Sequence, residues 1–206
     1  MRVLIMVSLW ITCGLLSSCF SPIQQTPPKT YLLTGTHSTH HNRQVIASTP
    51  TSQKIILLLP VETDALYDTV HLLYTTQPYQ ISYFIRHQWA ETPGSLLSSL
   101  ILQTLQDSQH FKIVLIPPAM GPYDELLKIR IQKIQQNFSV SPAIAELTIE
   151  ATLYDAKRNT FIATKKWQLT QPLVAASPEE GVRALNQATH LFLKNLIIFL
   201  NSTHTA

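Results

Sequence analysis

Residues 143–154 alternate between apolar and polar side chains, strictly so from Ala145 to Leu153. Glutamate and threonine fill four successive even-numbered positions, and the odd-numbered positions between and around them are apolar: Ala145, Leu147, Ile149, Ala151 and Leu153. Since successive side chains of a strand point to opposite faces, this pattern predicts a strand with one face in a core and the other in solvent. A short polar turn, 155–159, leads into residues 160–170, whose inward parity is kept by Phe161, Ala163, Trp167 and Leu169. The two segments therefore predict a β-hairpin.

The parity of the two strands also predicts their register. Opposed residues share a face of the sheet, so odd positions must face odd positions. The register that sets Ile149 opposite Trp167 also sets Glu150 opposite Lys166, where opposite charges contribute roughly 0.2–1 kcal/mol. A shift by two residues would lose that charge pair, so we expect the first register. It turns Lys165 inward, which requires either that the ammonium reaches solvent past the sheet edge or that a bulge resets the alternation.

Further strand patterns precede the hairpin. The aliphatic run 55–59 predicts a strand buried on both faces. Residues 126–136 alternate like the hairpin strands. In 79–88 the alternating positions Ile81, Tyr83 and Ile85 predict the buried face of a half-buried strand. Two more strands are expected, over 66–74 and 111–116.

Two helices complete the expected fold. Apolar residues recur every three or four positions and predict a helix over 94–107. Ser177-Pro178-Glu179-Glu180 forms a capping box with proline at the first helical position, which predicts a second helix to about Leu200. Its stretch from Leu191 onward is apolar on all sides, so it is either deeply buried or packs against a partner chain, a second copy of this chain included. The predicted fold class is α/β: a single domain with a mixed, largely antiparallel sheet covered by two main helices.

The N-terminus has the pattern of a secretory signal. Met1-Arg2 forms a short positive end, and Val3 to Leu16 is almost wholly apolar. As a helix this run would span about 21 Å, too short for a hydrocarbon core of roughly 30 Å. Residues 1–18 therefore predict a signal peptide.

Leu16-Ser17-Ser18-Cys19 resembles the lipobox of bacterial lipoproteins: an aliphatic residue, two small residues and a cysteine. The resemblance implies that the Cys19 thiol takes a diacylglyceryl group, that a peptidase cuts before it, and that the new amine is acylated, as with palmitate. Several acyl chains would anchor the protein stably. Trp10 and Ile11 precede the other cysteine, Cys13, so it lacks the small residues. Phe20 rather than aspartate follows Cys19, which favours the periplasmic face of the outer membrane over the inner membrane under the enterobacterial sorting rule.

Residues 19–53 are rich in Ser, Thr, Pro, Gln and His, and predict a flexible tether between the membrane and a domain at 54–202. Tyr31 to Leu33 (31–33) is an apolar island within it and a candidate edge strand. The sequence has two cysteines; with Cys13 removed and Cys19 modified, no thiol is left for a disulfide or a metal cluster. The formal charge of +3 is too small to indicate nucleic-acid binding.

No catalytic or cofactor motif emerges. The five glycines form no phosphate-binding loop, and the glutamates at 179–180 are the acids that a helix N-terminus favours. His37, His40 and His41 could bind a metal together, but no fourth ligand is visible, so a solvated loop is the simpler interpretation. We therefore predict no enzyme, no cofactor and no metal. A periplasmic hydrolase would need a polar pocket with shifted pKa values that the sequence does not single out.

Ile81-Ser-Tyr-Phe-Ile-Arg-His-Gln-Trp-Ala-Glu-Thr-Pro93 resembles the hallmark segment of the ABC-type transport auxiliary lipoprotein family. These lipoproteins accompany lipid transport systems of the mammalian cell entry (MCE) and paraquat-inducible types. Their pattern is a strand with Tyr, then Arg-x-x-Trp-Ala-x-x-Pro, then a leucine-rich helix, and here Arg86, Trp89 and Pro93 fill those places. The order of the lipobox, the strands and Ala184-Leu-Asn186 in the last helix also fits.

The resemblance implies an envelope protein that binds partners, namely an MCE-domain protein and ABC transporter subunits, and performs no chemistry. Arg86, Trp89 and Pro93 are its candidate partner-binding or hallmark residues. Interface anchors favour tryptophan, so Trp89 either belongs to a binding surface or packs under the following helix as core. An envelope-assembly lipoprotein that binds an outer-membrane protein or lipopolysaccharide would share the anchor and the domain size, and is the alternative function.

Overall fold

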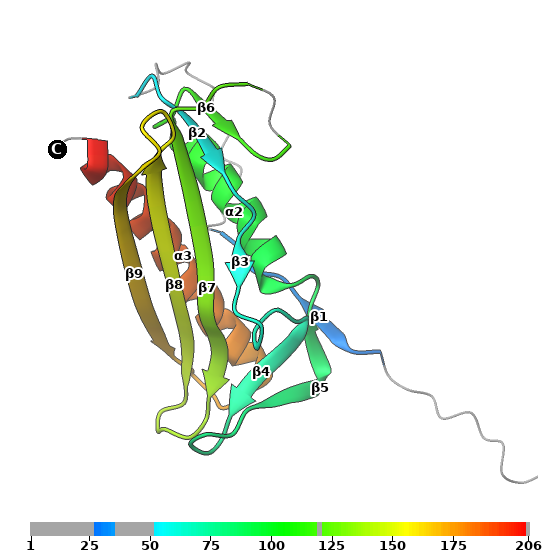
Figure 1. Cartoon of the computed structure of the whole chain (residues 1–206). Coiled ribbons are helices and arrows are strands. Elements are labelled where there is room, and N and C mark those ends of the chain that lie inside the picture. The colour runs from blue at the N-terminus through cyan, green and yellow to red at the C-terminus, as the bar shows by residue number, and fades with distance from the viewer. Residues whose placement is uncertain (1–26, 36–51, 119–120, 205–206) are drawn as a thin grey trace, which may run out of the picture.

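The computed structural model describes residues 27–35, 52–118 and 121–204 (Figure 1). The predicted signal peptide, Cys19 and the three tether histidines lie outside the described residues. The helices are α2 (Pro93–Asp107) and α3 (Pro178–His204). The strands are β1 (Lys29–Tyr31), β2 (Ile55–Leu58), β3 (Glu62–Thr63), β4 (His71–Thr75), β5 (Ser82–Trp89), β6 (Ile113–Leu115), β7 (Glu125–Asn137), β8 (Ile144–Asp155) and β9 (Thr160–Pro172).

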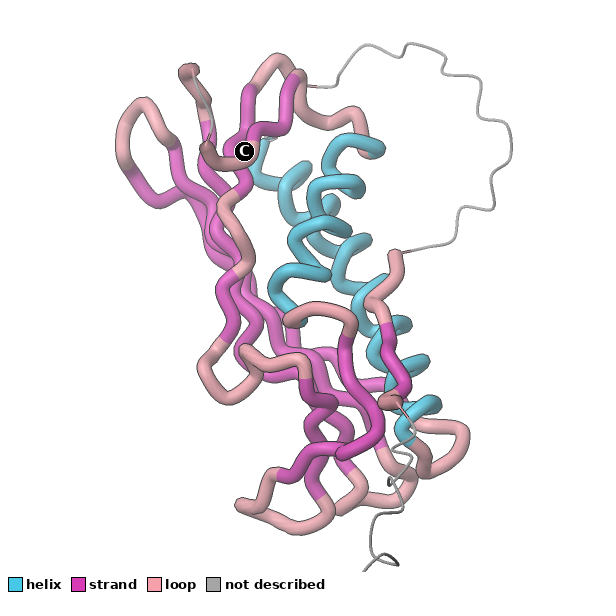
Figure 2. Tube along the Cα trace, turned by 90° about the vertical axis from the view of Figure 1, so that its right-hand side faces the viewer, coloured by secondary structure: helices cyan, strands magenta, loops and turns pink. Residues whose placement is uncertain are grey.

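The described strands form one open mixed sheet, and α2 and α3 cover one of its faces (Figure 2). β7 is the central strand. On one side it pairs with β8, which pairs with the edge strand β9; both ladders are long and antiparallel. On the other side β2, β3 and β4 pair in turn with successive parts of β7, all three parallel. β6 extends the sheet beyond β2, and β5 and then β1 extend it beyond β4. The predicted fold class is confirmed.

The predicted hairpin register is confirmed. Ile149 lies opposite Trp167, and Glu150 lies opposite Lys166. Lys165 pairs with Ala151 without a bulge at that point; because β9 is an edge strand, its side chain stays exposed, with the ammonium 5.6 Å from the centroid of the Trp167 ring.

One inward assignment in the hairpin is wrong. The register shifts between Leu153 and Tyr154, so that Tyr154 faces Phe161 near the turn. Phe161, which parity placed inward, is 58% exposed. The extra residue of this bulge reverses the faces beyond it, which alternation alone does not reveal.

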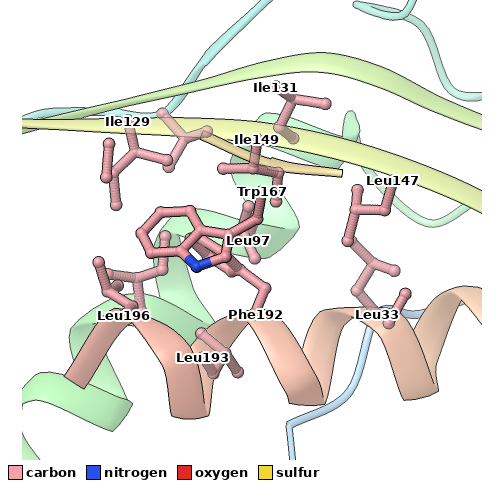
Figure 3. Close-up of a cluster of buried hydrophobic side chains, with 14 of the residues drawn as sticks. Leu33, Leu97, Ile129, Ile131, Leu147, Ile149, Trp167, Phe192, Leu193 and Leu196 are labelled. Atoms are coloured by element: carbon pink, nitrogen blue, oxygen red, sulfur yellow. The ribbon is translucent and has the colours of Figure 1, made fainter. Parts of the chain in front are cut away.

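The core fills the space between the sheet and the helices (Figure 3). Trp167 lies at its centre, with its ring edge-on to Phe192 at 5.3 Å and to Phe199 at 5.8 Å between centroids. Edge-to-face pairs of this kind add to the free energy of burial. The apolar end of α3 is thus buried within its own domain on this face, whereas Ile198 on the opposite face is exposed.

The prediction of which β5 side chains are buried is wrong. Ile81, Tyr83 and Ile85 are 37%, 54% and 88% exposed, while Phe84 and Trp89 pack against or within the core. The cause is an irregularity between β4 and β5, since the pairing jumps from Leu73–Tyr83 to His71–Gln88 and leaves extra β5 residues unpaired. β4 is also shorter than the predicted 66–74, because the amides of Tyr67 and Asp68 both donate to the Asp64 carbonyl in a turn.

Gly94 lets the start of α2 approach the loop after β2. A Cβ on Gly94 would come within 2.8 Å of the Val61 carbonyl oxygen, a backbone atom that cannot turn aside. We expect Gly94→Ala to lower the free energy of unfolding by about 1–3 kcal/mol, the usual range for overpacking. Urea denaturation measures this, and Ser99→Ala, an exposed position on the same helix, should leave stability nearly unchanged. A Gly94→Ala variant as stable as the parent would show that the loop moves freely.

Candidate functional site

Residues 27–35, here called the arm, lie within the predicted tether 19–53 and pack against the domain. The arm runs along β5 and beside α3 (Figures 1 and 2). β1 pairs in parallel with β5, with Lys29 next to His87 and Tyr31 next to Trp89. The Ala90 amide donates to the Tyr31 carbonyl at 2.8 Å, so the ladder reaches the hallmark segment.

Side chains from β5 and α3 hold the first part of the arm. The Tyr31 ring stacks on the His87 ring, and the Tyr31 hydroxyl lies 2.9 Å from His87 Nδ1. In the first turn of α3, Glu179 Oε1 accepts a hydrogen bond from Lys29 Nζ at 2.8 Å and lies 3.4 Å from the Tyr31 hydroxyl. The arm is therefore bound from two sides.

The electrostatics of this cluster set its pH dependence. The hydrogen bond from Lys29 lowers the pKa of the Glu179 carboxyl below its ordinary value, and burial raises the pKa of the Tyr31 hydroxyl. A carboxyl with a lowered pKa stabilises the folded state above its ordinary pKa, and this contribution is lost as the pH falls through the lowered value. Because the Lys29 side chain is exposed, solvent screens the pair, and its contribution is small.

Asn186 of α3 holds the second part of the arm. Its Oδ1 accepts from the Thr34 amide at 2.8 Å, and its Nδ2 donates to the Leu32 carbonyl at 3.3 Å. Leu33, between them, is 5% exposed and joins the core beside α3 (Figure 3). Asn186 thus replaces the strand partner that the backbone of Leu32 and Thr34 would otherwise lack.

We expect Asn186→Ala to loosen the arm. The variant loses two hydrogen bonds to the backbone, each contributing about 0.5–1.5 kcal/mol. Hydrogen exchange of the Thr34 amide should therefore accelerate by roughly tenfold or more, while the amides of β8 keep their protection. Gln187→Ala, the exposed neighbour on α3, is the matched control. Equal exchange rates at Thr34 in the two variants would contradict the role of Asn186.

The structure separates the three hallmark residues. Trp89 is 2% exposed and belongs to the core, and Pro93 is buried at the first turn of α2. Arg86 is exposed on β5. Trp89 therefore packs as core, the second of the two interpretations given for it, and forms no part of the outer surface.

Sequence reasoning missed the residues that meet at the arm. Lys29, His87 and Glu179 contact one another across large separations in sequence, and no periodic pattern links them. The sequence marks Glu179 only as an acidic residue at a helix N-terminus. The one usable signal was Tyr31 to Leu33, an apolar island in a polar segment.

The surroundings of the arm include a hollow but no group of metal-binding side chains among the described residues. An open hollow of about 450 Å³ lies beside it, with Thr34, Arg183 and His190 among its lining residues. Within 27–35, 52–118 and 121–204, no three His, Cys, Asp or Glu side chains are grouped so that they could hold a metal ion. In the same ranges no helix has the length and apolar character needed to cross a membrane.

Comparison with known proteins gives a family and a fold. The family model described as ABC-type transport auxiliary lipoprotein component matches residues 31–196. A crystal structure from Xanthomonas campestris, of a protein assigned to the family DUF330, superposes with a TM-score of 0.72 at 14% identity and covers 86% of this chain and 97% of that one. An uncharacterized protein gives a TM-score of 0.65 at 11% identity, with 85% and 99% covered. At these identities the two structures establish the fold alone. None of the curated proteins matches the chain in sequence.

Proposed function

Because the chain belongs to the family of ABC-type transport auxiliary lipoprotein components, we propose that it serves an MCE-associated lipid transport system by binding partner proteins. The family match carries this proposal, since residues 31–196 include most of the arm, the whole sheet from β2 onward and most of α3. Membership makes the protein a transport-auxiliary lipoprotein of the cell envelope. The finer role, with an MCE-domain protein and the transporter subunits as partners and no catalysis, is the proposal.

The anchor in this proposal is Cys19, acylated after cleavage of residues 1–18. The tether and domain boundaries follow from the sequence: a tether over 19–53 and a domain over 54–202. The arm supports a change to these boundaries, because residues 29–35 pack on β5 and α3. We therefore count residues 29–35 with the domain and not with the flexible part of the tether. The residue after Cys19, Phe20, favours the periplasmic face of the outer membrane.

The surface best suited to a protein partner is the outer face of β5. It carries Tyr83 and Ile85, which are 54% and 88% exposed, and the next residue, Arg86, is exposed as well. Tyrosine and arginine are enriched among interface residues that carry binding energy. Tyr83 is also held in place by stacking on His71, with 4.6 Å between ring centroids, so little side-chain entropy remains to be lost on binding. We assign partner binding to this face and not to the buried Trp89.

Photo-crosslinking in the native envelope tests the proposal. A photoreactive residue at Tyr83 should capture the MCE-domain protein or transporter subunits, identified by mass spectrometry. The same residue at Lys166, which is exposed on the edge strand β9, is the control and should not. Capture of only outer-membrane proteins or lipopolysaccharide at Tyr83 would overturn the proposal and favour the envelope-assembly alternative.

A further inference from the structure

Three loops meet at one end of the sheet: 76–81 after β4, 138–143 after β7 and 173–177 after β9. We call them the three-loop end. The first two are neighbours because Thr75 pairs with Asn137 and the Phe138 amide donates to the Thr75 carbonyl at 2.8 Å. The third joins them through the Leu173 amide, which donates to the Ala143 carbonyl at 2.8 Å. In Figure 1 this end lies at the bottom.

The three-loop end carries no charged side chain. Its loops read Thr-Gln-Pro-Tyr-Gln-Ile, Phe-Ser-Val-Ser-Pro-Ala and Leu-Val-Ala-Ala-Ser, without Asp, Glu, Lys or Arg. Tyr79 is fully exposed, and Val174 and Val140 are 89% and 44% exposed. The opposite end is charged: the β8–β9 turn holds Lys157, which pairs with Asp124 at 2.6 Å. One end of the sheet is therefore uncharged and partly apolar, and the other end is charged.

Tyr79 occupies a turn position that suits it poorly. The Gln80 amide donates to the Gln77 carbonyl, which makes Tyr79 the third residue of a turn after Pro78. Its φ is +65°, in the left-handed region that this position of a type II turn requires and that glycine or asparagine fills at lower cost. The fold gains no packing from the ring, because the ring is fully exposed. A strained, exposed aromatic residue points to a contact outside the domain.

The chain approaches the domain from the side of this same end. β1 runs parallel to β5, which leads away from the loop 76–81, and Lys29 pairs with His87, five residues beyond Ser82 or about 17 Å along the strand. Lys29 also contacts Glu179 in the first turn of α3, immediately after the loop 173–177. Cys19 precedes Lys29 by ten residues, which can span at most about 35 Å. The far end of α3, 27 residues long, lies about 40 Å away from these contacts.

We infer that the three-loop end rests on the lipid bilayer in which Cys19 is anchored, with Tyr79, Val140 and Val174 at the level of the headgroups. The inference depends on the lipid anchor proposed above. The amphipathic ring of tyrosine suits the membrane interface. No charge has to leave water when these loops approach lipid. Three side chains bind weakly on their own, but the short stretch from Cys19 to Lys29 keeps them at a high effective concentration near the surface.

Because the loops are uncharged, the contact should not depend on anionic lipid or on salt. A site that binds through basic residues would respond to both. This independence separates the proposed contact from general electrostatic attraction to the membrane.

Lipid-quenched fluorescence tests the inference. The chain from Cys19 onward has one thiol, which can be coupled to a maleimide lipid in phosphatidylcholine vesicles whether or not cells acylate it. A failure of the acylation proposal therefore leaves this test intact. In Tyr79→Trp the emission that the new indole adds to that of the buried Trp89 and Trp167 should shift to the blue and lose intensity in vesicles of brominated phosphatidylcholine. Phe161→Trp, at the charged end, is the control and should show neither change.

Three further results decide whether the three-loop end contacts the bilayer. Val174→Asp combined with Tyr79→Trp should reduce the quenching, with circular dichroism confirming that the fold is kept. Quenching that is absent, or equal at positions 79 and 161, would overturn the inference. Protection of position 79 only when an MCE-domain protein is added would overturn it as well and assign this end to a protein partner.

Discussion

A Cys19→Ala variant should accumulate as an unprocessed, unacylated precursor. Cys19 is the cysteine preceded by two small residues, Ser17 and Ser18, and its thiol is the group that the lipobox resemblance marks for acylation. Without the thioether the peptidase has no substrate, so residues 1–18 stay attached. Buried acyl chains contribute about 0.8 kcal/mol per CH₂, so the loss of the acyl chains removes the stable anchor.

Intact-mass spectrometry of the membrane fraction measures the result. The wild-type protein should begin at Cys19 and carry the mass of three acyl chains, and the variant should carry none. Cys13→Ala is the matched control, because Trp10 and Ile11 exclude Cys13 from the lipobox pattern; this variant should be processed as the wild type is. An unmodified Cys19 in wild-type membranes would contradict the lipid anchor.

Trp89→Ala should lower the free energy of unfolding by about 3–5 kcal/mol, as truncation of a buried aromatic residue does. Trp89 is 2% exposed and belongs to the main core cluster. Domains of this size are stable by roughly 5–15 kcal/mol, so the loss is a large share of the total. Urea denaturation of purified protein measures it.

Two variants separate stability from binding. Trp89→Phe keeps most of the buried area and should cost less than Trp89→Ala. Tyr83→Ala removes a side chain that is 54% exposed, so it should change stability little and weaken capture of the partner. If Trp89→Ala kept full stability yet abolished partner binding, the assignment of Trp89 to the core would be untenable.

The hairpin could be predicted in detail because its information is local. A short turn joins the two strands, and the one buried face fixes which residues point inward. The pairing of Ile149 with Trp167 therefore follows from the hairpin sequence alone. The helices were predictable for a similar reason, since Pro93 and Pro178 mark their first turns and their apolar residues repeat within a few positions.

The outer side of the sheet could not be predicted in this way. Alternation in β5 predicts the wrong buried face, because the pairing with β4 is irregular between Tyr83 and Gln88. No residue type in this segment indicates the irregularity. Phe161 was misassigned for the same physical reason. β2, β3 and β4 share one long partner, β7, and such parallel pairings over large sequence distances leave no local signature.

The arm shows the same limit at the candidate site. Contacts of Lys29 and Tyr31 with Glu179 join residues that are about 150 positions apart. Family resemblance did identify the hallmark segment, but that pattern does not distinguish a core residue such as Trp89 from a surface residue such as Arg86. Burial in three dimensions is what separates them.

The proposed role is tested most directly by the rate of lipid transfer between the two membranes of the envelope. A strain that lacks this protein and any redundant transporter should transfer lipid more slowly and become sensitive to detergent. Wild-type protein should restore the rate, whereas Cys19→Ala, present at the same level, should not. A transfer rate that is unchanged in the deletion strain would contradict a role in lipid transport.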